Sequence, residues 1–104
     1  MITAVFYRRD GKYSGFRISG HSGYSESGSD IVCAACSAMT MLTVNTVTDI
    51  LGVSADVVSD ESDASVRFSL KSGSETASSL IEGLRSELTA LESDYPDNVR
   101  VITQ

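Results

Sequence analysis

The pair Asp10-Gly11 constrains the start of this chain more than any other feature. Asp-Gly between two runs of β-forming residues is a strong sign of a two-residue hairpin turn. The run before it, residues 2–8, reads Ile-Thr-Ala-Val-Phe-Tyr-Arg, and the run after it, residues 13–19, places Phe16 and Ile18 on one face. Because a hairpin requires antiparallel pairing, the sequence predicts a sheet that begins with two antiparallel strands.

A loop and a long helix are expected next. Residues 20–29 hold three glycines and four serines, a composition that cannot pack a core and is typical of a mobile loop. Ser29 and Asp30 are good N-cap residues, so a helix is predicted from about Asp30 to Leu51, ending at Gly52. Apolar residues occupy most of its circumference, and we therefore expect it to be largely buried.

The second half predicts another hairpin and another helix. Residues 56–59 and 65–70 read as strands joined by the polar turn 60–63. Ser72-x-x-Glu75 is a capping box that would open the second helix, and Pro96 would end it. The helix places its apolar residues on one stripe: Ala77, Leu80, Ile81, Leu84, Leu88 and Leu91.

A last strand is expected at residues 99–102, which completes the order ββαββαβ. The expected fold class is α+β, with one mixed or mostly antiparallel sheet carrying two helices. A chain of 104 residues is one domain's worth, and no boundary is visible, so we expect a single domain over residues 1–104.

Charge and hydropathy exclude some partners. Eight basic and 14 acidic residues give a net charge of −6, which disfavours nucleic-acid binding and suits a basic partner. The longest apolar-rich segment, residues 31–51, is interrupted by polar side chains, so we expect no membrane span. No secretory leader is visible, and we expect a cytoplasmic protein with two free thiols, Cys33 and Cys36.

The one histidine and the first cysteine could form a catalytic pair. His21 ends a predicted strand, and Cys33 lies three residues into a helix capped by Asp30. The unpaired N–H groups of a helix start favour a thiolate, and the same groups could stabilise an oxyanion. A nearby imidazole would complete the parts for acyl transfer. The alternative from spacing alone is a small buried cysteine and an inert, exposed histidine.

Two stretches resemble a known family. Gly20-His21-Ser22-Gly23, a glycine-bearing loop, and then Ser29-Asp30-Ile31-Val32-Cys33-Ala34-Ala35-Cys36-Ser37-Ala38 are similar to the signature of the ribosomal-processing cysteine proteases, the Prp family. The likeness covers the whole chain, including the ending Tyr-x-x-Asn-Val-Arg.

The resemblance implies a function. Family members remove the N-terminal extension of the large-subunit ribosomal protein L-twenty-seven, cutting after a pair of aromatic residues. Cys33 matches the family's nucleophile and His21 its base. The resemblance also implies a two-layer sandwich, a homodimer, a loop that is mobile until substrate binds, and no metal or cofactor.

Four neighbours are supporting candidates. Gly20 would keep the approach to the histidine free of side-chain bulk. Asp30 is either the helix N-cap, the preferred interpretation, or a carboxylate that orients the histidine. Ser37, one turn after the nucleophile, could hydrogen-bond in the site or to the helix backbone. Tyr24 either closes over an aromatic-bearing substrate or is an exposed tyrosine in a linker.

Cys36 departs from the family pattern, which more often has a small apolar residue there. Cys33-x-x-Cys36 at a helix start has the shape of a dithiol redox motif, but the βαβ context and later proline of thioredoxin are missing. With His21 the two cysteines would supply three ligands, one short of a closed zinc site. A third alternative is a non-catalytic protein that binds a ribosomal partner.

Overall fold

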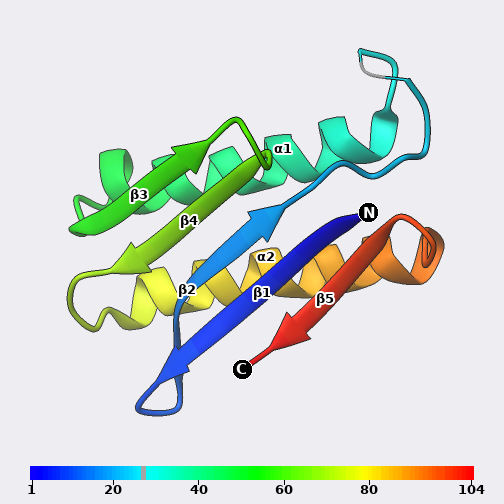
Figure 1. The fold of residues 1–104 in the computed structure, drawn as a ribbon. Helices are drawn as coiled ribbons and strands as arrows, with labels where there is room; N and C mark the ends of the chain where they lie inside the picture. The colour runs from blue at the N-terminus through cyan, green and yellow to red at the C-terminus, as the bar shows by residue number, and fades with distance from the viewer. Residues whose placement is uncertain (27) are drawn as a thin grey trace.

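The structure, a computed structural model, describes residues 1–26 and 28–104, and it places two helices on one face of a sheet (Figure 1). The α+β two-layer sandwich and the order ββαββαβ are both confirmed. The predicted loop 20–29 includes Ser27, which lies outside the described residues. The elements are β1 (Ile2–Arg9), β2 (Lys12–Ser19), α1 (Ile31–Asn45), the π-helical turn η1 (Thr46–Ile50), β3 (Ala55–Asp60), β4 (Ser65–Leu70), α2 (Glu75–Asp94) and β5 (Val99–Thr103).

The sheet has the strand order β3-β4-β2-β1-β5. Its neighbours pair antiparallel except β1 and β5, which are parallel, so the prediction of a mostly antiparallel sheet is confirmed. At the first turn Asp10 and Gly11 have φ angles of 56° and 78°, the left-handed pair that a tight hairpin turn needs. In this order β1 and β5 lie side by side, with β5 at one edge of the sheet.

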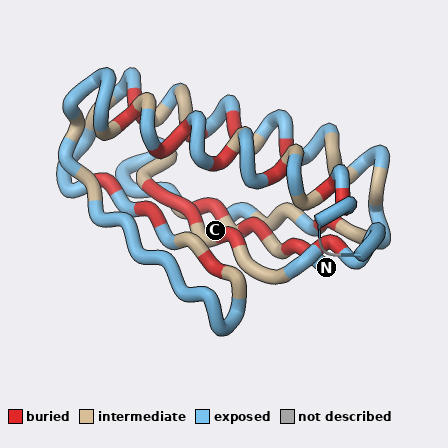
Figure 2. Tube along the Cα trace, turned by 90° about the horizontal axis from the view of Figure 1, so that it is seen from above, coloured by how far each residue is buried: buried red, intermediate tan, exposed pale blue. Residues whose placement is uncertain are grey.

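The core lies between the sheet and the helices, where buried residues line the facing surfaces (Figure 2). Phe6, Phe16 and Phe68 stand on three adjacent strands with ring centroids 5.7 and 5.2 Å apart. From the helix side, the predicted apolar stripe of α2 packs against them. Its buried members are Ala77, Ile81, Leu84 and Leu88, while Leu80 and Leu91 are partly buried.

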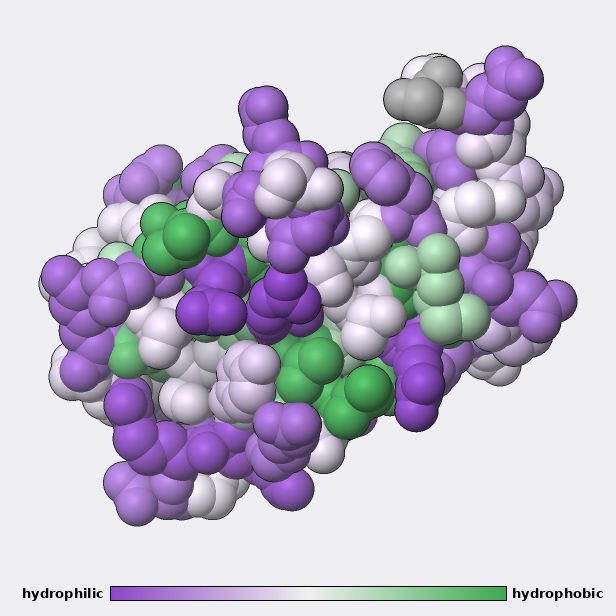
Figure 3. All heavy atoms as spheres, viewed as in Figure 1, coloured by the Kyte–Doolittle hydropathy of each residue, from purple (hydrophilic) through white to green (hydrophobic). Residues whose placement is uncertain are grey.

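The opposite face of the sheet is open to solvent. Figure 3 shows it as a mixed surface, on which hydrophilic side chains separate smaller groups of hydrophobic ones. This is the usual condition of an antiparallel sheet with one covered face.

One of the two ends of α2 differs from the prediction. Ser74, not Ser72, caps α2, and its hydroxyl accepts a hydrogen bond from the amide of Ala77 at 3.2 Å. Both serines suit a cap, and the extended backbone of Ser74 places its hydroxyl over the first turn. At the other end Tyr95 leaves helical geometry directly before Pro96, as predicted.

The prediction that the first long helix is largely buried is wrong for the folded chain. Only one face of α1 packs on the sheet, through Val32, Cys36, Thr40, Thr43 and Val44. The helical region also ends differently, because residues 46–50 widen into a π-helical turn before Gly52. Large apolar side chains remain exposed on this segment: Ile31, Met41, Leu42, Ile50 and Leu51.

By length and composition alone, residues 31–50 could cross a membrane. In the fold, however, this segment packs one face against the sheet. A core helix of a globular domain has the same length and composition, so the packing favours that interpretation.

Candidate active site

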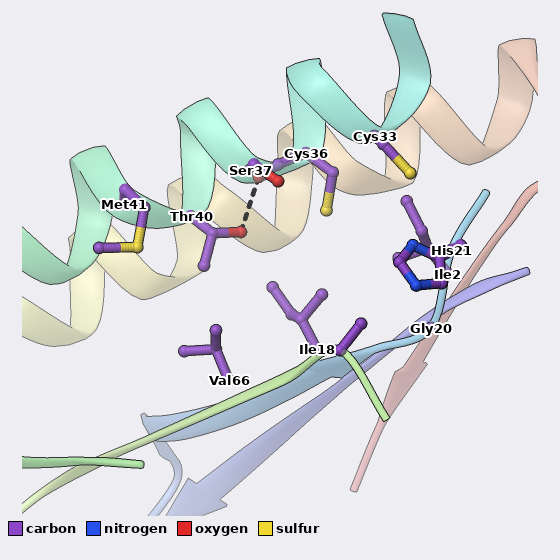
Figure 4. Close-up of a pocket in the computed structure, with 11 residues that line it drawn as sticks. Ile2, Ile18, Gly20, His21, Cys33, Cys36, Ser37, Thr40, Met41 and Val66 are labelled. Carbon is purple, nitrogen blue, oxygen red and sulfur yellow. Dashed lines mark hydrogen bonds between the residues drawn. The ribbon is translucent and has the colours of Figure 1, made fainter. Parts of the chain in front are cut away.

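The two candidate catalytic residues line the same pair of adjoining pockets, of about 200 and 430 Å³. His21 follows the end of β2 and is exposed, and Cys33 lies in the first turn of α1 and is half-buried. Figure 4 shows the Cys33 sulfur directed from the helix toward the side where His21 lies. Among residues 1–26 and 28–104, no hydrogen bond joins the imidazole to the sulfur.

Asp30 fixes the start of α1 beneath the cysteine. One carboxylate oxygen, Oδ1, accepts hydrogen bonds from the amides of Val32 and Cys33, both at 3.0 Å. The predicted N-cap is therefore confirmed, and Cys33 is the third residue of the helix. In the part of the chain that the structure describes, the carboxylate makes no hydrogen bond to His21, so its orienting role is not supported.

The other oxygen of Asp30, Oδ2, accepts hydrogen bonds from the loop after β2. It accepts a hydrogen bond from the hydroxyl of Ser22, and the amide of Ser25 lies 3.3 Å away. The Ser22 hydroxyl is the main reason that the pKa of Asp30 falls from 3.8 to about 2, with the loop and helix amides adding to it against a smaller opposing effect of desolvation. Asp30 is therefore ionised at neutral pH.

Ser22 also reaches the cysteine directly. Its backbone amide donates a hydrogen bond to Cys33 Sγ at 3.3 Å, and the residue is only 2% exposed. The Cys33 sulfur is thus held by a backbone N–H group at the start of α1. The sequence does not reveal the role of Ser22, because a stretch rich in glycine and serine predicts a loop without a packed position. Its place inside the Gly-His-Ser-Gly stretch was the available signal.

The loop is held on its far side by the turn between α2 and β5. The side-chain amide of Asn98 donates to the Ser22 carbonyl at 2.9 Å. Tyr24 packs edge-on against Tyr95 with ring centroids 5.2 Å apart, although Tyr24 remains 49% exposed. Tyr24 is not among the residues that line the two pockets, so a lid role is not supported in this conformation. The partners Tyr95 and Asn98 belong to the Tyr-x-x-Asn ending, to which the sequence analysis assigned no role.

Gly20 lines the smaller pocket. Its φ is +87°, and a Cβ there would overlap the carbonyl oxygen of Met1. The backbone beside Met1 therefore requires glycine at this position, and the predicted role in the approach to His21 stays a prediction. Ser37 is exposed at the rim of both pockets, and neither of its predicted hydrogen bonds is found among the described residues.

Cys36 is buried one turn behind Cys33 on the wall of the smaller pocket, and both thiols are free. Burial raises the pKa of the Cys36 thiol, and a negative charge on Cys33 would add to this, while a hydrogen bond with Thr40 opposes it. Within residues 1–26 and 28–104, no three His, Cys, Asp or Glu side chains are grouped so that they could hold a metal ion. The geometry thus gives no support to the zinc alternative, and the raised pKa disfavours Cys36 against Cys33 as the nucleophile of proteolysis.

Taken together, a half-buried sulfur at a helix start and an imidazole on the same pocket are the nucleophile and the base that acyl transfer needs. The groups come from two elements only, the end of β2 and the start of α1, and one buried serine joins them.

Comparison with known proteins agrees with this chemistry. The family model described as "Cysteine protease Prp" matches residues 1–100. The ribosomal processing cysteine protease Prp of Bacillus subtilis is 32% identical over 109 residues, covering 99% of this chain and 97% of the relative. The protein of the same name from Staphylococcus aureus is 26% identical over 103 residues, covering 97% of each.

Solved structures give the same result. The ribosomal processing protease Prp of S. aureus, in complex with a covalently linked product peptide, superposes with a TM-score of 0.91 at 26% identity over the whole of both chains. The same S. aureus protease with a substrate peptide gives a TM-score of 0.86 at 25% identity, again over all of both chains. The chain therefore belongs to the Prp family of cysteine proteases.

Proposed function

We propose that Cys33 is the nucleophile of this protease and that His21 is its general base and acid. The observation that carries the proposal is the placement of Cys33 Sγ at the third position of α1, where it accepts the Ser22 amide and shares both pockets with the chain's one histidine. Reacting groups often lie apart in a substrate-free site, and the His21 imidazole is exposed on the pockets that Cys33 also lines.

In this mechanism His21 takes the proton of the Cys33 thiol, and the sulfur attacks the scissile carbonyl carbon. The positive end of the α1 dipole stabilises the resulting oxyanion, because the amides of Val32, Cys33 and Ala34 already donate to Asp30. The imidazolium then returns the proton to the amine that leaves, which breaks the C–N bond and forms a thioester. Water, deprotonated by His21, hydrolyses the thioester and frees the cysteine.

The proposed substrate is the N-terminal extension of ribosomal protein L-twenty-seven, cut after an aromatic pair, as a step in ribosome assembly. Three observations support it. The relatives are named ribosomal processing proteases. The net charge of −6 suits a basic ribosomal protein. The smaller pocket measures about 200 Å³, and a cavity of about 150 Å³ already holds a benzene ring. Its apolar walls are Ile2, Ile18, Val66 and Met41.

The test is cleavage of a synthetic peptide that spans the processing site, followed by mass spectrometry. Cys33→Ala and His21→Ala should each reduce kcat/KM by at least about 10³-fold, since each removes one half of the reacting pair. Cys36→Ala is the matched control, because dithiol chemistry would need both cysteines whereas proteolysis needs one. We expect it to cleave within about threefold of the unaltered protein. Cleavage by Cys33→Ala at the normal rate would refute the assignment.

We also propose that the protease is a cytoplasmic homodimer. Free thiols at Cys33 and Cys36 suit a reducing compartment. The large apolar side chains left exposed on the α1–η1 segment, of which Ile50 is 77% and Leu42 69% exposed, suit burial against a second copy. Val57 and Val58 of the edge strand β3 are exposed as well. Fractionation of cells that express the protein would test the location.

A further inference from the structure

The turn that joins α2 to β5 is held by backbone hydrogen bonds and contacts the loop after β2. Within it, the amides of Asn98 and Val99 both donate to the Tyr95 carbonyl, at 3.0 and 3.1 Å. The Asn98 carbonyl in turn accepts the amide of Ile2, the first residue of β1, at 2.9 Å. Because its backbone is bonded on both sides, Asn98 can hold its side chain in one place.

That side chain holds the serine which contacts the cysteine. The Asn98 Nδ2 group donates to the Ser22 carbonyl at 2.9 Å, across 76 residues of sequence. The remaining polar groups of Ser22 are also occupied. Its amide donates to Cys33 Sγ, and its hydroxyl donates to Asp30 while accepting the Tyr24 amide at 3.1 Å. Ser22 is thus clamped between the α2–β5 turn and the start of α1.

We propose that Asn98 is a positioning residue of the protease, which holds the Ser22 amide against Cys33 Sγ and so favours the thiolate. The proposal rests on Cys33 being the nucleophile. A hydrogen bond to an anion is shorter and stronger than one to a neutral group, so an N–H held at the sulfur stabilises the thiolate more than the thiol. Without Asn98, the Ser22 backbone is fixed from the Asp30 side alone, and its amide can turn away from the sulfur.

A merely structural role for Asn98 makes a different prediction. In that case, removing the side chain would lower the melting temperature without changing how readily Cys33 ionises. The two roles are separated by a measurement on the thiol itself, which needs no protease substrate.

The experiment compares Asn98→Ala and Asn98→Asp with Asn45→Asp. Asn98→Ala removes the donor without adding charge, and Asn98→Asp removes it while keeping the size. Asn45 is exposed near the far end of α1, so Asn45→Asp makes the same chemical change away from the site. The rate of Cys33 alkylation by iodoacetamide is followed from pH 5 to pH 10. Fragment-ion mass spectrometry distinguishes Cys33 from Cys36.

Both Asn98 variants should shift the midpoint of the alkylation profile upward by about 0.5–1 pH unit, which slows alkylation near neutral pH by about 3–10-fold. Asn45→Asp should leave the profile unchanged. With the processing-site peptide, kcat should fall by a similar factor while KM stays within about twofold, because the contact to Ser22 lies behind the sulfur and not in the pockets.

Two results would overturn the proposal. One is an alkylation profile in Asn98→Ala that matches the unaltered protein, which would assign any effect of Asn98→Asp to its charge alone. The other concerns the unaltered protein and does not depend on a variant folding: a Ser22 amide proton signal that does not move downfield as Cys33 ionises would remove the hydrogen bond on which the proposal depends.

The outcomes separate this proposal from the proposed function. An alkylation profile that depends on Asn98, in a protein whose cleavage survives Cys33→Ala, would show that Asn98 supports the Cys33 thiol and would refute Cys33 as the nucleophile. If cleavage needs Cys33 and His21 but the alkylation profile does not change in Asn98→Ala, the catalytic roles stand and the positioning role of Asn98 is refuted.

Discussion

The hydroxyl of Ser22 donates a hydrogen bond to the carboxylate of Asp30, and this contact joins the loop after β2 to the first turn of α1. The same carboxylate caps the helix that carries Cys33. One ionised group therefore sets both the helix start and the position of the loop that carries His21. The behaviour of Asp30 with pH should report on the whole arrangement.

Acid should weaken the fold through Asp30. Its pKa in the folded protein, about 2, is below the ordinary value of 3.8, so its stabilising effect is complete above about pH 5 and is lost as the pH falls toward 2. Asp30→Asn keeps a good cap but cannot accept both loop bonds. We expect a melting temperature several degrees below that of the unaltered protein at pH 7, and a difference that narrows toward pH 2. An equal difference at both pH values would contradict this account of Asp30.

Removing the Ser22 hydroxyl should return Asp30 toward an ordinary acid. The hydroxyl is the largest cause of the low pKa, so Ser22→Ala should raise the pKa of Asp30 toward 3.8, measured by carboxyl NMR titration. Ser25→Ala is the matched control, because Ser25 binds Asp30 through its backbone amide, which the substitution keeps. An equal change in both variants would show that the loop as a whole, and not the hydroxyl, lowers this pKa.

Replacing Gly20 should lower the free energy of unfolding by more than replacing Gly52, which also has a positive φ. Gly20→Ala combines a positive φ with overlap against the Met1 carbonyl, and we expect it to lower the free energy of unfolding by about 2–4 kcal/mol. Gly52 has φ +67° but open space around it, so Gly52→Ala should cost only about 1 kcal/mol. Urea denaturation measures both, and equal losses would mean that the contact with Met1 relaxes freely.

Oxidation should reveal a role for Cys36. Peroxide converts the Cys33 thiolate to a sulfenic acid, and the Cys36 thiol on the same pocket wall can displace its hydroxyl as water to form a disulfide. Activity lost to mild peroxide should then return with a thiol reductant. In Cys36→Ala the sulfenic acid has no such partner and oxidises further, so recovery should fail. Equal recovery in both proteins would rule out protection by Cys36.

The exposed apolar side chains of α1 and η1 should hold the homodimer together. Leu42→Lys places a charge on this surface and should reduce the mass measured by light scattering from twice 11.1 kDa to 11.1 kDa. Thr89→Lys, on the exposed side of α2, is the control and should remain dimeric. A dimer that survives Leu42→Lys would place the interface elsewhere.

Local patterns predicted the local parts of this structure. Asp10-Gly11 predicted the hairpin because a tight turn depends on adjacent residues alone, and the stripe of α2 predicted its buried face because helical spacing is regular. Asp30 predicted the cap, and with it the place of Cys33, from a preference that acts over three residues.

Contacts between distant segments could not be predicted in this way. The bond from Asn98 to Ser22 has no periodicity, and a serine in a glycine-rich stretch looks the same whether it is buried or solvated. The burial of α1 could not be predicted for a related reason. A helix that is apolar all round must be covered, but the pattern does not say whether this chain or a second copy covers it.

The parallel pairing of β1 with β5 affects the order in which the protein folds during its synthesis. Ile2 lies beside Val99, so β1 has both of its neighbours only after β5 has been made. During synthesis from the N-terminus, His21 and Cys33 leave the ribosome long before Asn98 does. A chain made only as far as α2 would therefore carry the proposed nucleophile and base without the Asn98 contact, and the site would be complete only once the α2–β5 turn and β5 were added.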